Sequence, residues 1–281
     1  MALRLIDLRI NWLLQYVGEI TTFDPNDYPD VKPRLDQIRG YLQDTRAAIV
    51  TCDRSPSDWA KQTDRSKALA DVVARVEAEF PGRILIGPTD RARFEAEPES
   101  LCWVILQTTS DVEPLADWFD RGVRVFHLTD PDHLDLLASL GSADGPKPAV
   151  DLGGLTSTGQ DEALTWFEAD PSRRSRLFPI LTTATGQHPL QRLRALNGLV
   201  GLDLGPTAED LAATIGLLLA DPSSHAGIAI STNFLERPSA ASELATVEAI
   251  LQWLTTRFGQ PVAESIAHTN AMALIRHITG E

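Results

Sequence analysis

The chain has 281 residues, of which 43% are hydrophobic, and it carries a formal net charge of −14 at pH 7. This length and composition suffice for one large core, and we expect a single domain over residues 1–281. The acidic balance disfavours binding to nucleic-acid phosphates or anionic membranes. The apolar runs are shorter than the roughly 20 residues of a membrane helix, and no leader precedes the first of them, so we expect a cytoplasmic protein.

The first predicted strand covers residues 3–11 (LRLIDLRIN) and ends in alternating polar residues. Alternate side chains of a strand share a face, so Asp7, Arg9 and Asn11 are expected to point at one mouth of the fold. The following residues, 12–33, are rich in Asp, Pro and Thr, which predicts a long loop at that mouth.

Six further stretches are short, apolar and rich in β-branched residues, and they are predicted strands: residues 46–52, 101–109, 123–130, 178–183, 199–204 and 227–232. Helical periodicity alternates with them in residues 66–80, 112–121, 160–169, 189–196, 208–220, 239–258 and 261–278. Residues 143–159 are predicted to form a loop. The alternation predicts an α/β fold, a (β/α)8 TIM-type barrel, with seven strands and so one βα unit short of complete. Cys52 and Cys102 lie in apolar runs and are expected to be buried free thiols.

Several segments, in chain order, resemble the membrane (renal) dipeptidase family of zinc peptidases. Residues 7–11 (DLRIN) are similar to the Asp-x-His-x-Asp segment that opens the family, and residues 117–130 (DWFDRGVRVFHLTD) to a segment that ends in Leu-Thr-His. Residues 153–160 resemble its Gly-Leu-Thr-x-x-Gly helix entry, residues 207–234 its last βα repeat, and residues 263–275 its closing helix. The resemblance implies an amidohydrolase-like barrel of the metal-dependent hydrolase kind, with its site at the C-terminal ends of the strands.

The resemblance also places the family's functional positions on this sequence, where the zinc ligands are replaced. The first His and Asp fall on Arg9 and Asn11, and the bridging Glu falls on Gln107. The last-strand Asp, which is also the catalytic base, falls on Asn233, and the substrate-contacting His falls on Asp130. Two further ligand histidines belong to the fifth and sixth strands of the family.

Thr183 is expected at the position of one of these two histidines, and the unit that holds the other is expected to be missing. Zinc needs carboxylate or imidazole donors, whereas carboxamides supply no charge and arginine adds a permanent cation. We therefore expect the Arg9 guanidinium in the space of the metals, paired with nearby carboxylates. The predicted degenerate pocket consists of Asp7, Arg9, Asn11, Gln107, Asp130, Thr183, Asp203 and Asn233.

A purely structural role competes with each assignment. Asp7 could anchor the first strand as readily as line a pocket, and Gln107 and Asn233 could be satisfied core amides. His127 is out of phase with the pocket face expected for Asp130, which favours a packed histidine. The remaining histidines show no spacing typical of a metal site.

The sequence thus predicts a membrane-dipeptidase-like protein without its zinc ligands. This would be a non-catalytic homologue that binds a small polar or dipeptide-like ligand at the barrel mouth, or a scaffold for a partner, with no cofactor. The alternative is an active dipeptidase or related amide hydrolase that holds zinc through other residues, among them Asp7, Asp130, His188 and Asp203. The resemblance also implies a possible homodimer, as in an interaction module.

Overall fold

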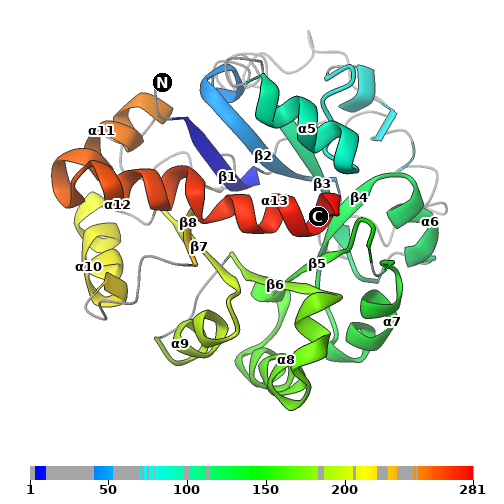
Figure 1. Ribbon diagram of the computed structural model, residues 1–281. Coiled ribbons are helices and arrows are strands. Elements are labelled where there is room, and N and C mark those ends of the chain that lie inside the picture. Colours follow the sequence, from blue (N-terminus) through cyan, green and yellow to red (C-terminus); the bar gives the residue numbers. More distant parts are fainter. Residues whose placement is uncertain are drawn as a thin grey trace, which may run out of the picture.

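The computed structural model describes residues 4–10, 41–52, 70, 73–74, 76–78, 80–97, 102–111, 114–142, 144–182, 187–204, 207–219, 227–232, 244 and 246–280, with only the backbone described at residues 9, 10, 187 and 188. Within these ranges, eight parallel strands form a closed barrel in which each strand pairs with the next and β8 returns to β1 (Figure 1). The strands are β1 Leu5–Ile10, β2 Thr45–Thr51, β3 Trp103–Thr109, β4 Val123–His127, β5 Ala149–Asp151, β6 Phe178–Leu181, β7 Leu199–Asp203 and β8 Ile228–Ser231.

Helices surround the barrel and cross one of its ends (Figure 1). The α-helices with both ends described are α5 Pro88–Ala96, α6 Leu115–Asp120, α7 Leu134–Ser139, α8 Ser157–Ala169, α9 Gln187–Ala195, α10 Ala208–Leu219, α11 Val247–Phe258, α12 Gln260–Glu264 and α13 Ala271–Thr279, and residues 41–44 are also helical. Short 3-10 turns are η1 Pro131–His133, η2 Leu152–Gly154 and η3 Pro171–Ser175, and a π-helical turn, η5, covers Ser265–Thr269. The helix predicted over residues 261–278 is therefore interrupted by this π turn. No helix in the described ranges has the length and apolar character needed to cross a membrane.

The barrel fold is as predicted, but the expected missing unit is present, so the count of seven strands was wrong. The eighth strand is β5, within the segment predicted to be a loop. It has only three residues, follows Pro146 and Pro148, and runs directly into the glycine-containing turn η2, so its sequence carries no strand pattern of normal length. Its pairing with both β4 and β6 nevertheless completes the closed sheet.

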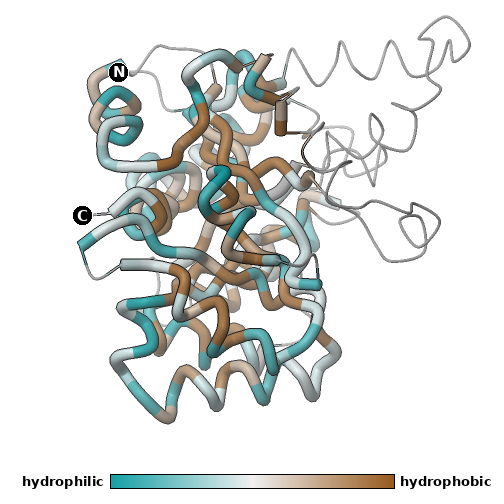
Figure 2. Tube along the Cα trace, turned by 90° about the vertical axis from the view of Figure 1, so that its right-hand side faces the viewer, coloured by the Kyte–Doolittle hydropathy of each residue, from teal (hydrophilic) through white to brown (hydrophobic). Residues whose placement is uncertain are grey.

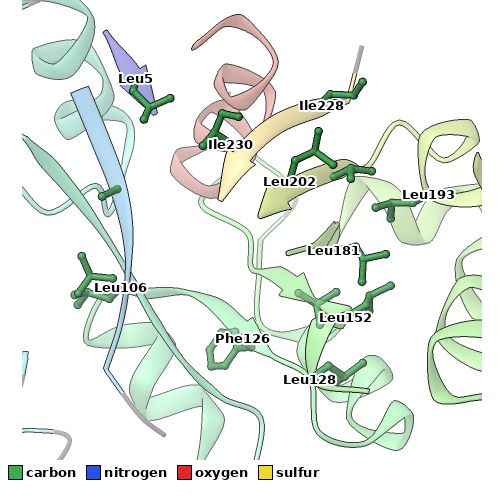
Figure 3. Close-up of a cluster of buried hydrophobic side chains, with 14 of the residues drawn as sticks. Leu5, Leu106, Phe126, Leu128, Leu152, Leu181, Leu193, Leu202, Ile228 and Ile230 are labelled. Atoms are coloured by element: carbon green, nitrogen blue, oxygen red, sulfur yellow. The ribbon is translucent and has the colours of Figure 1, made fainter. Parts of the chain in front are cut away.

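The strands bury apolar side chains on both faces, as expected for a parallel barrel enclosed by helices. Outward-facing side chains such as Leu5, Leu106 and Phe126 pack against the surrounding helices (Figure 3). Inward-facing side chains such as Ile6, Leu8 and Ile105 form a second cluster inside the barrel. In the tube view, hydrophobic segments accordingly gather in the interior of the molecule, and hydrophilic stretches lie mainly at its periphery (Figure 2).

One end of the barrel is closed by α13, which lies across it in Figure 1. The apolar side of this helix, including Leu274 and Ile278, belongs to the interior cluster. His277 Nε2 lies 3.2 Å from the carbonyl oxygen of Pro148, which precedes β5, so the closed end is the N-terminal end of the strands. Side chains at the opposite, C-terminal end therefore define the mouth at which a ligand could bind.

Cys52 and Cys102 are both buried free thiols, which confirms the prediction. Burial raises the pKa of the Cys102 thiol above its ordinary range, so it stays protonated and unreactive.

Candidate functional site at the C-terminal mouth

Seven polar side chains share the inward-facing parity of their strands at the C-terminal end of the barrel. Each lies two or four residues beyond an inward-facing position, such as Ile49 on β2, Ile105 on β3 or Ala149 on β5. We call this set the mouth: it consists of Thr51, Gln107, His127, Asp151, Thr182, Asp203 and Ser231.

A fully buried carboxylate, Asp151, connects the C-terminal ends of four strands, β3 to β6. Its Oδ2 accepts a 2.6 Å hydrogen bond from the Thr182 hydroxyl, lies 3.0 Å from Nδ1 of His127, and accepts a longer 3.4 Å contact from Nε2 of Gln107. Its Oδ1 accepts the backbone N–H groups of Thr182 and Gly153 at 3.1 and 3.0 Å. Hydrogen bonds donated to both oxygens favour the ionised form of a carboxylate.

Gln107 extends the network to β2. Its Oε1 accepts a 2.7 Å hydrogen bond from the Thr51 hydroxyl, while its Nε2 faces Asp151. The orientation of the amide follows from the carboxylate, which has no proton to give. Gln107 is therefore at the mouth, as predicted, and it is also a satisfied buried amide, so both of its proposed roles coincide in one residue.

His127 is the partly exposed member of this network. Its side chain is 21% exposed, whereas that of Asp151 is 0% exposed. The two residues are paired in register at the ends of β4 and β5, which brings the imidazole and the carboxylate together. The expectation of a purely packed histidine therefore differs from the structure, in which the ring lies at the mouth.

Asp7 lies on the outer face of β1. It alternates with the inward-facing Ile6 and Leu8, and its carboxylate is fully buried between the barrel and the segment before β2. Oδ2 accepts hydrogen bonds from the Tyr41 hydroxyl at 2.8 Å and the Thr232 hydroxyl at 2.6 Å. Burial, with the neighbouring carboxylate of Asp7, raises the pKa of Tyr41, which keeps the phenol a donor. Asp7 therefore anchors the first strand, and its side chain does not point into the interior of the barrel.

Of the two other predicted carboxylates, Asp203 lies at the mouth and Asp130 lies on the surface. Asp130 is exposed at the start of η1, where its Oδ1 accepts the backbone N–H of Asp132 at 3.0 Å as a cap. Asp203 is at the inward-facing end of β7, in register with Ser231 of β8. The structure thus brings Asp203 to the mouth with Gln107 and leaves Asp130 on the surface beyond β4.

Four other predicted pocket residues have side chains outside the described part of the chain. The side chain of Arg9 and residues Asn11, Thr183 and Asn233 lie outside the described part of the chain, as does the side chain of His188. The expected pairing of the Arg9 guanidinium therefore remains a prediction.

Ser231 adds a polar group on the far side of the mouth from His127. Its Oγ is buried and has no hydrogen-bond partner within the described residues. Space beside it is provided by Gly201, where an added Cβ would lie 3.0 Å from Cβ of Ser231 and 3.3 Å from Cδ1 of Leu8. A ligand atom or water at this position would complete the hydrogen bonding of the hydroxyl.

Sequence reasoning missed Asp151 and Thr182 altogether. Asp151 was hidden because β5 was assigned to a loop, although Ala149 and Val150 before it give a short apolar run. Thr182 precedes the predicted position 183 by one residue, and its parity with the inward-facing Ile180 was the signal that could have identified it.

Within the described ranges, no three His, Cys, Asp or Glu side chains come together in a way that could hold a metal ion. The mouth instead contains one engaged carboxylate, Asp151, one imidazole, His127, one carboxamide, Gln107, and the carboxylate of Asp203.

Comparisons with known proteins support the fold. No protein-family model matches the chain, and no curated protein matches its sequence. Among solved structures, it is similar to dipeptidase AC, a metallopeptidase of family M19, with a TM-score of 0.68 and 13% identity over 100% of both chains. It is also similar to a metallopeptidase from Rhodobacter sphaeroides bound to a phosphinate mimic of the dipeptide L-Ala-D-Ala, with a TM-score of 0.69 and 12% identity over 99% of this chain and 100% of the other. At this identity the comparisons concern the fold, and the chain therefore has the eight-stranded barrel fold of the M19 dipeptidase-type metallopeptidases, as its sequence resemblance predicted.

Proposed function

We propose that this protein is a non-catalytic homologue of the dipeptidase fold that binds a small polar ligand at the C-terminal mouth of its barrel. The observation that carries the proposal is the engagement of Asp151, the fully buried carboxylate of the mouth. Four donors from Gln107, Gly153 and Thr182, together with Nδ1 of His127, surround its two oxygens. A carboxylate offers about four lone-pair sites, so Asp151 has no free site for a metal ion.

The remaining described groups of the mouth also fit a dinuclear zinc centre poorly. Gln107 presents a carboxamide whose oxygen already accepts the Thr51 hydroxyl, and an amide cannot supply the charge that holds two dications together. His127 directs Nδ1 to Asp151, which leaves one imidazole nitrogen and the carboxylate of Asp203 as further donors. We therefore derive no chemical step through zinc.

The same groups suit a small polar molecule. The N-terminal end of the barrel is filled by α13, so the C-terminal mouth is where strand-end side chains can reach a ligand. Ser231 offers a hydroxyl that makes no hydrogen bond within the described residues, and His127 offers a partly exposed ring. A ligand with several donors and acceptors, a dipeptide among them, matches these groups.

Thermal unfolding in the presence of small polar compounds tests this proposal. We expect L-Ala-D-Ala, free amino acids or related polar molecules to raise the Tm by linkage, with a stabilisation of about 2.7 kcal/mol at a concentration of 100 times Kd. The matched variant Ser231→Ala should weaken this shift, whereas Ser139→Ala, at an exposed position on α7, should leave it unchanged. A scaffold without a ligand site would show no shift with any compound.

An active dipeptidase or related amide hydrolase with a non-standard metal site is the second candidate, because the solved structures with this fold include metallopeptidases. It predicts hydrolysis of L-Ala-D-Ala that depends on added zinc and is abolished by a chelator. Our proposal predicts no such hydrolysis. We further expect the combined variant Arg9→His, Asn11→Asp, Gln107→Glu and Asn233→Asp not to bind two zinc ions, whereas stoichiometric dinuclear loading would support the second candidate.

Two wider expectations accompany the proposal. We propose that the protein acts in the cytoplasm and that it can form a homodimer, as the family resemblance implies. Light scattering of the purified chain tests the dimer directly.

A further inference from the structure

We propose that His127 and Asp151 form a metal-independent acid–base pair, in which Nε2 of His127 accepts a proton or hydrogen bond from a hydroxyl or ammonium group of the bound molecule. This inference rests on the ligand-binding function proposed above and names the chemistry of the group that the ligand presents. It assigns His127 to direct ligand contact and Asp151 to positioning.

Asp151 and His127 differ in burial and therefore in role. The carboxylate is 0% exposed and held from two backbone amides and two further side chains, while the imidazole is 21% exposed. A buried, rigid carboxylate beside a partly exposed imidazole is the arrangement that orients a histidine for proton transfer. A histidine that served only to fill the core would not need exposure at the mouth.

Asp151 determines the tautomer of the His127 ring. Nδ1 of His127 lies 3.0 Å from Oδ2 of Asp151, and an ionised carboxylate accepts but does not donate. The ring must therefore carry its proton on Nδ1 when it is neutral. Nε2 is then left with a lone pair, and it makes no hydrogen bond within the described residues. The matching ligand group must bring its own proton.

Nε2 of His127 lies beside Gly154, in the turn after β5. An added Cβ at Gly154 would lie 2.4 Å from Nε2 and 2.7 Å from the carbonyl oxygen of Leu128. Real Cβ atoms do not approach other atoms so closely, so only glycine at position 154 is compatible with this ring position. The turn after β5 thus supplies both a donor to Asp151, through Gly153, and the room that His127 needs.

The proton transfer itself is balanced within the pair and the ligand. The O–H or N–H bond of the ligand breaks as the Nε2–H bond forms, and the electron pair stays on the ligand atom. His127 becomes an imidazolium, whose charge the adjacent Asp151 carboxylate balances, and the reverse transfer restores the starting state. No oxidant, reductant or metal ion takes part.

Nitrogen-15 NMR of the ligand-free protein tests the tautomer directly. Long-range proton–nitrogen spectra distinguish protonated from unprotonated ring nitrogens, and His127→Gln identifies the signals of His127. We expect unprotonated Nε2 and protonated Nδ1 in the neutral ring. In Asp151→Asn this preference should be lost, whereas the control Asp130→Asn, at an exposed cap, should retain it. An Nε2–H tautomer in the native protein would overturn the proposal.

Acylation by diethyl pyrocarbonate, mapped by mass spectrometry, supplies a second measurement that needs no variant. The lone pair of Nε2 attacks a carbonyl carbon and the C–O bond to ethyl carbonate breaks; the ring loses its Nδ1 proton, and the protonated leaving group decomposes to carbon dioxide and ethanol. His277 is the internal reference, because its Nε2 lies within hydrogen-bond distance of Pro148. We expect His127 to react severalfold faster, because the ring of His277 is largely buried at the closed end of the barrel. Equal or slower reaction of His127 would contradict an available Nε2.

These measurements use the ligand-free protein, so they separate the two proposals. If neutral His127 carries its proton on Nδ1 and is acylated rapidly, but no compound raises the Tm, the acid–base pair is supported and the ligand-binding function is contradicted. Stabilisation by polar compounds with the opposite tautomer would support the binding function and overturn the acid–base pair.

Discussion

Asp7 and Thr232 lie 225 positions apart in the chain and close the barrel through a two-point contact. Oδ1 of Asp7 accepts the backbone N–H of Thr232 at 3.0 Å, and Oδ2 accepts its hydroxyl at 2.6 Å. β1 and β8 are in register at a single described pair, Asp7 with Ile230, so the carboxylate extends a short seam. The aspartate near the start of the chain therefore stabilises the last junction of the sheet.

Replacing Asp7 by Asn should destabilise this seam. The amide keeps the shape of the side chain but loses the charge-assisted hydrogen bonds and turns a donor towards the hydroxyls of Tyr41 and Thr232. We expect a loss of about 1–3 kcal/mol in the free energy of unfolding, measured by urea denaturation, and faster hydrogen exchange at the Thr232 amide. A change below about 0.5 kcal/mol, the range of ordinary surface substitutions, would contradict the anchoring role.

Gln107→Glu tests whether the mouth tolerates the negative charge of the bridging glutamate that the family resemblance places at this position. The new carboxylate would face Oδ2 of Asp151, at the 3.4 Å now spanned by Nε2 of Gln107. We expect destabilisation of about 1–3 kcal/mol at neutral pH from the uncompensated charge, whereas Gln252→Glu, on the exposed side of α11, should change stability little.

The pH dependence of Gln107→Glu provides its own check. Repulsion from Asp151 raises the pKa of the introduced carboxyl in the folded state above its unfolded value. The folded state then binds more protons than the unfolded state, so the variant should regain stability relative to wild type as the pH falls towards 5. Equal deficits at neutral and acidic pH would show that sterics, rather than charge, cause the loss.

His277 should make the protein less stable in mild acid. Burial against the N-terminal end of the barrel lowers its pKa to about 4, from an ordinary value near 6.5. Between these values the unfolded chain binds a proton that the folded protein does not, so stability falls as pH decreases through this window, by at most about 3 kcal/mol. His277→Gln can still donate to Pro148 and removes the titration, so it should flatten this part of the stability curve. An unchanged slope would contradict the assignment.

Gly154→Ala and Gly216→Ala are expected to change the free energy of unfolding in opposite directions. At Gly154 the added Cβ meets the Leu128 carbonyl and the His127 ring, and we expect a loss of about 1–3 kcal/mol. At Gly216, an exposed position inside α10, nothing lies within 4 Å of the added atom, and alanine should stabilise the helix by about 0.5–1 kcal/mol. Thermal denaturation of both variants measures the difference.

The sequence predicted the barrel well because most of its strands are long apolar runs alternating with amphipathic helices. It failed at β5, since three residues between prolines and glycines give no periodicity, and their strand conformation depends on pairing with β4 and β6. The site was harder to predict. Gln107 and Asp203 were predicted because they lie near the ends of predicted strands. Asp151 was missed because its strand, β5, was assigned to a loop. Asp7 alternates with the axial Ile6 and Leu8, and the strand pattern alone did not show which of its two buried faces lies inside the barrel.

Metal content tests the central claim that the mouth is a hydrogen-bonding site in which Asp151 is fully used by protein donors. The protein should be expressed with added zinc, dialysed without a chelator and analysed by elemental mass spectrometry. Our account predicts well under one zinc ion per chain, with Tm unaffected by subsequent chelation. Two zinc ions per chain would contradict it and would support a dipeptidase with a non-standard metal site.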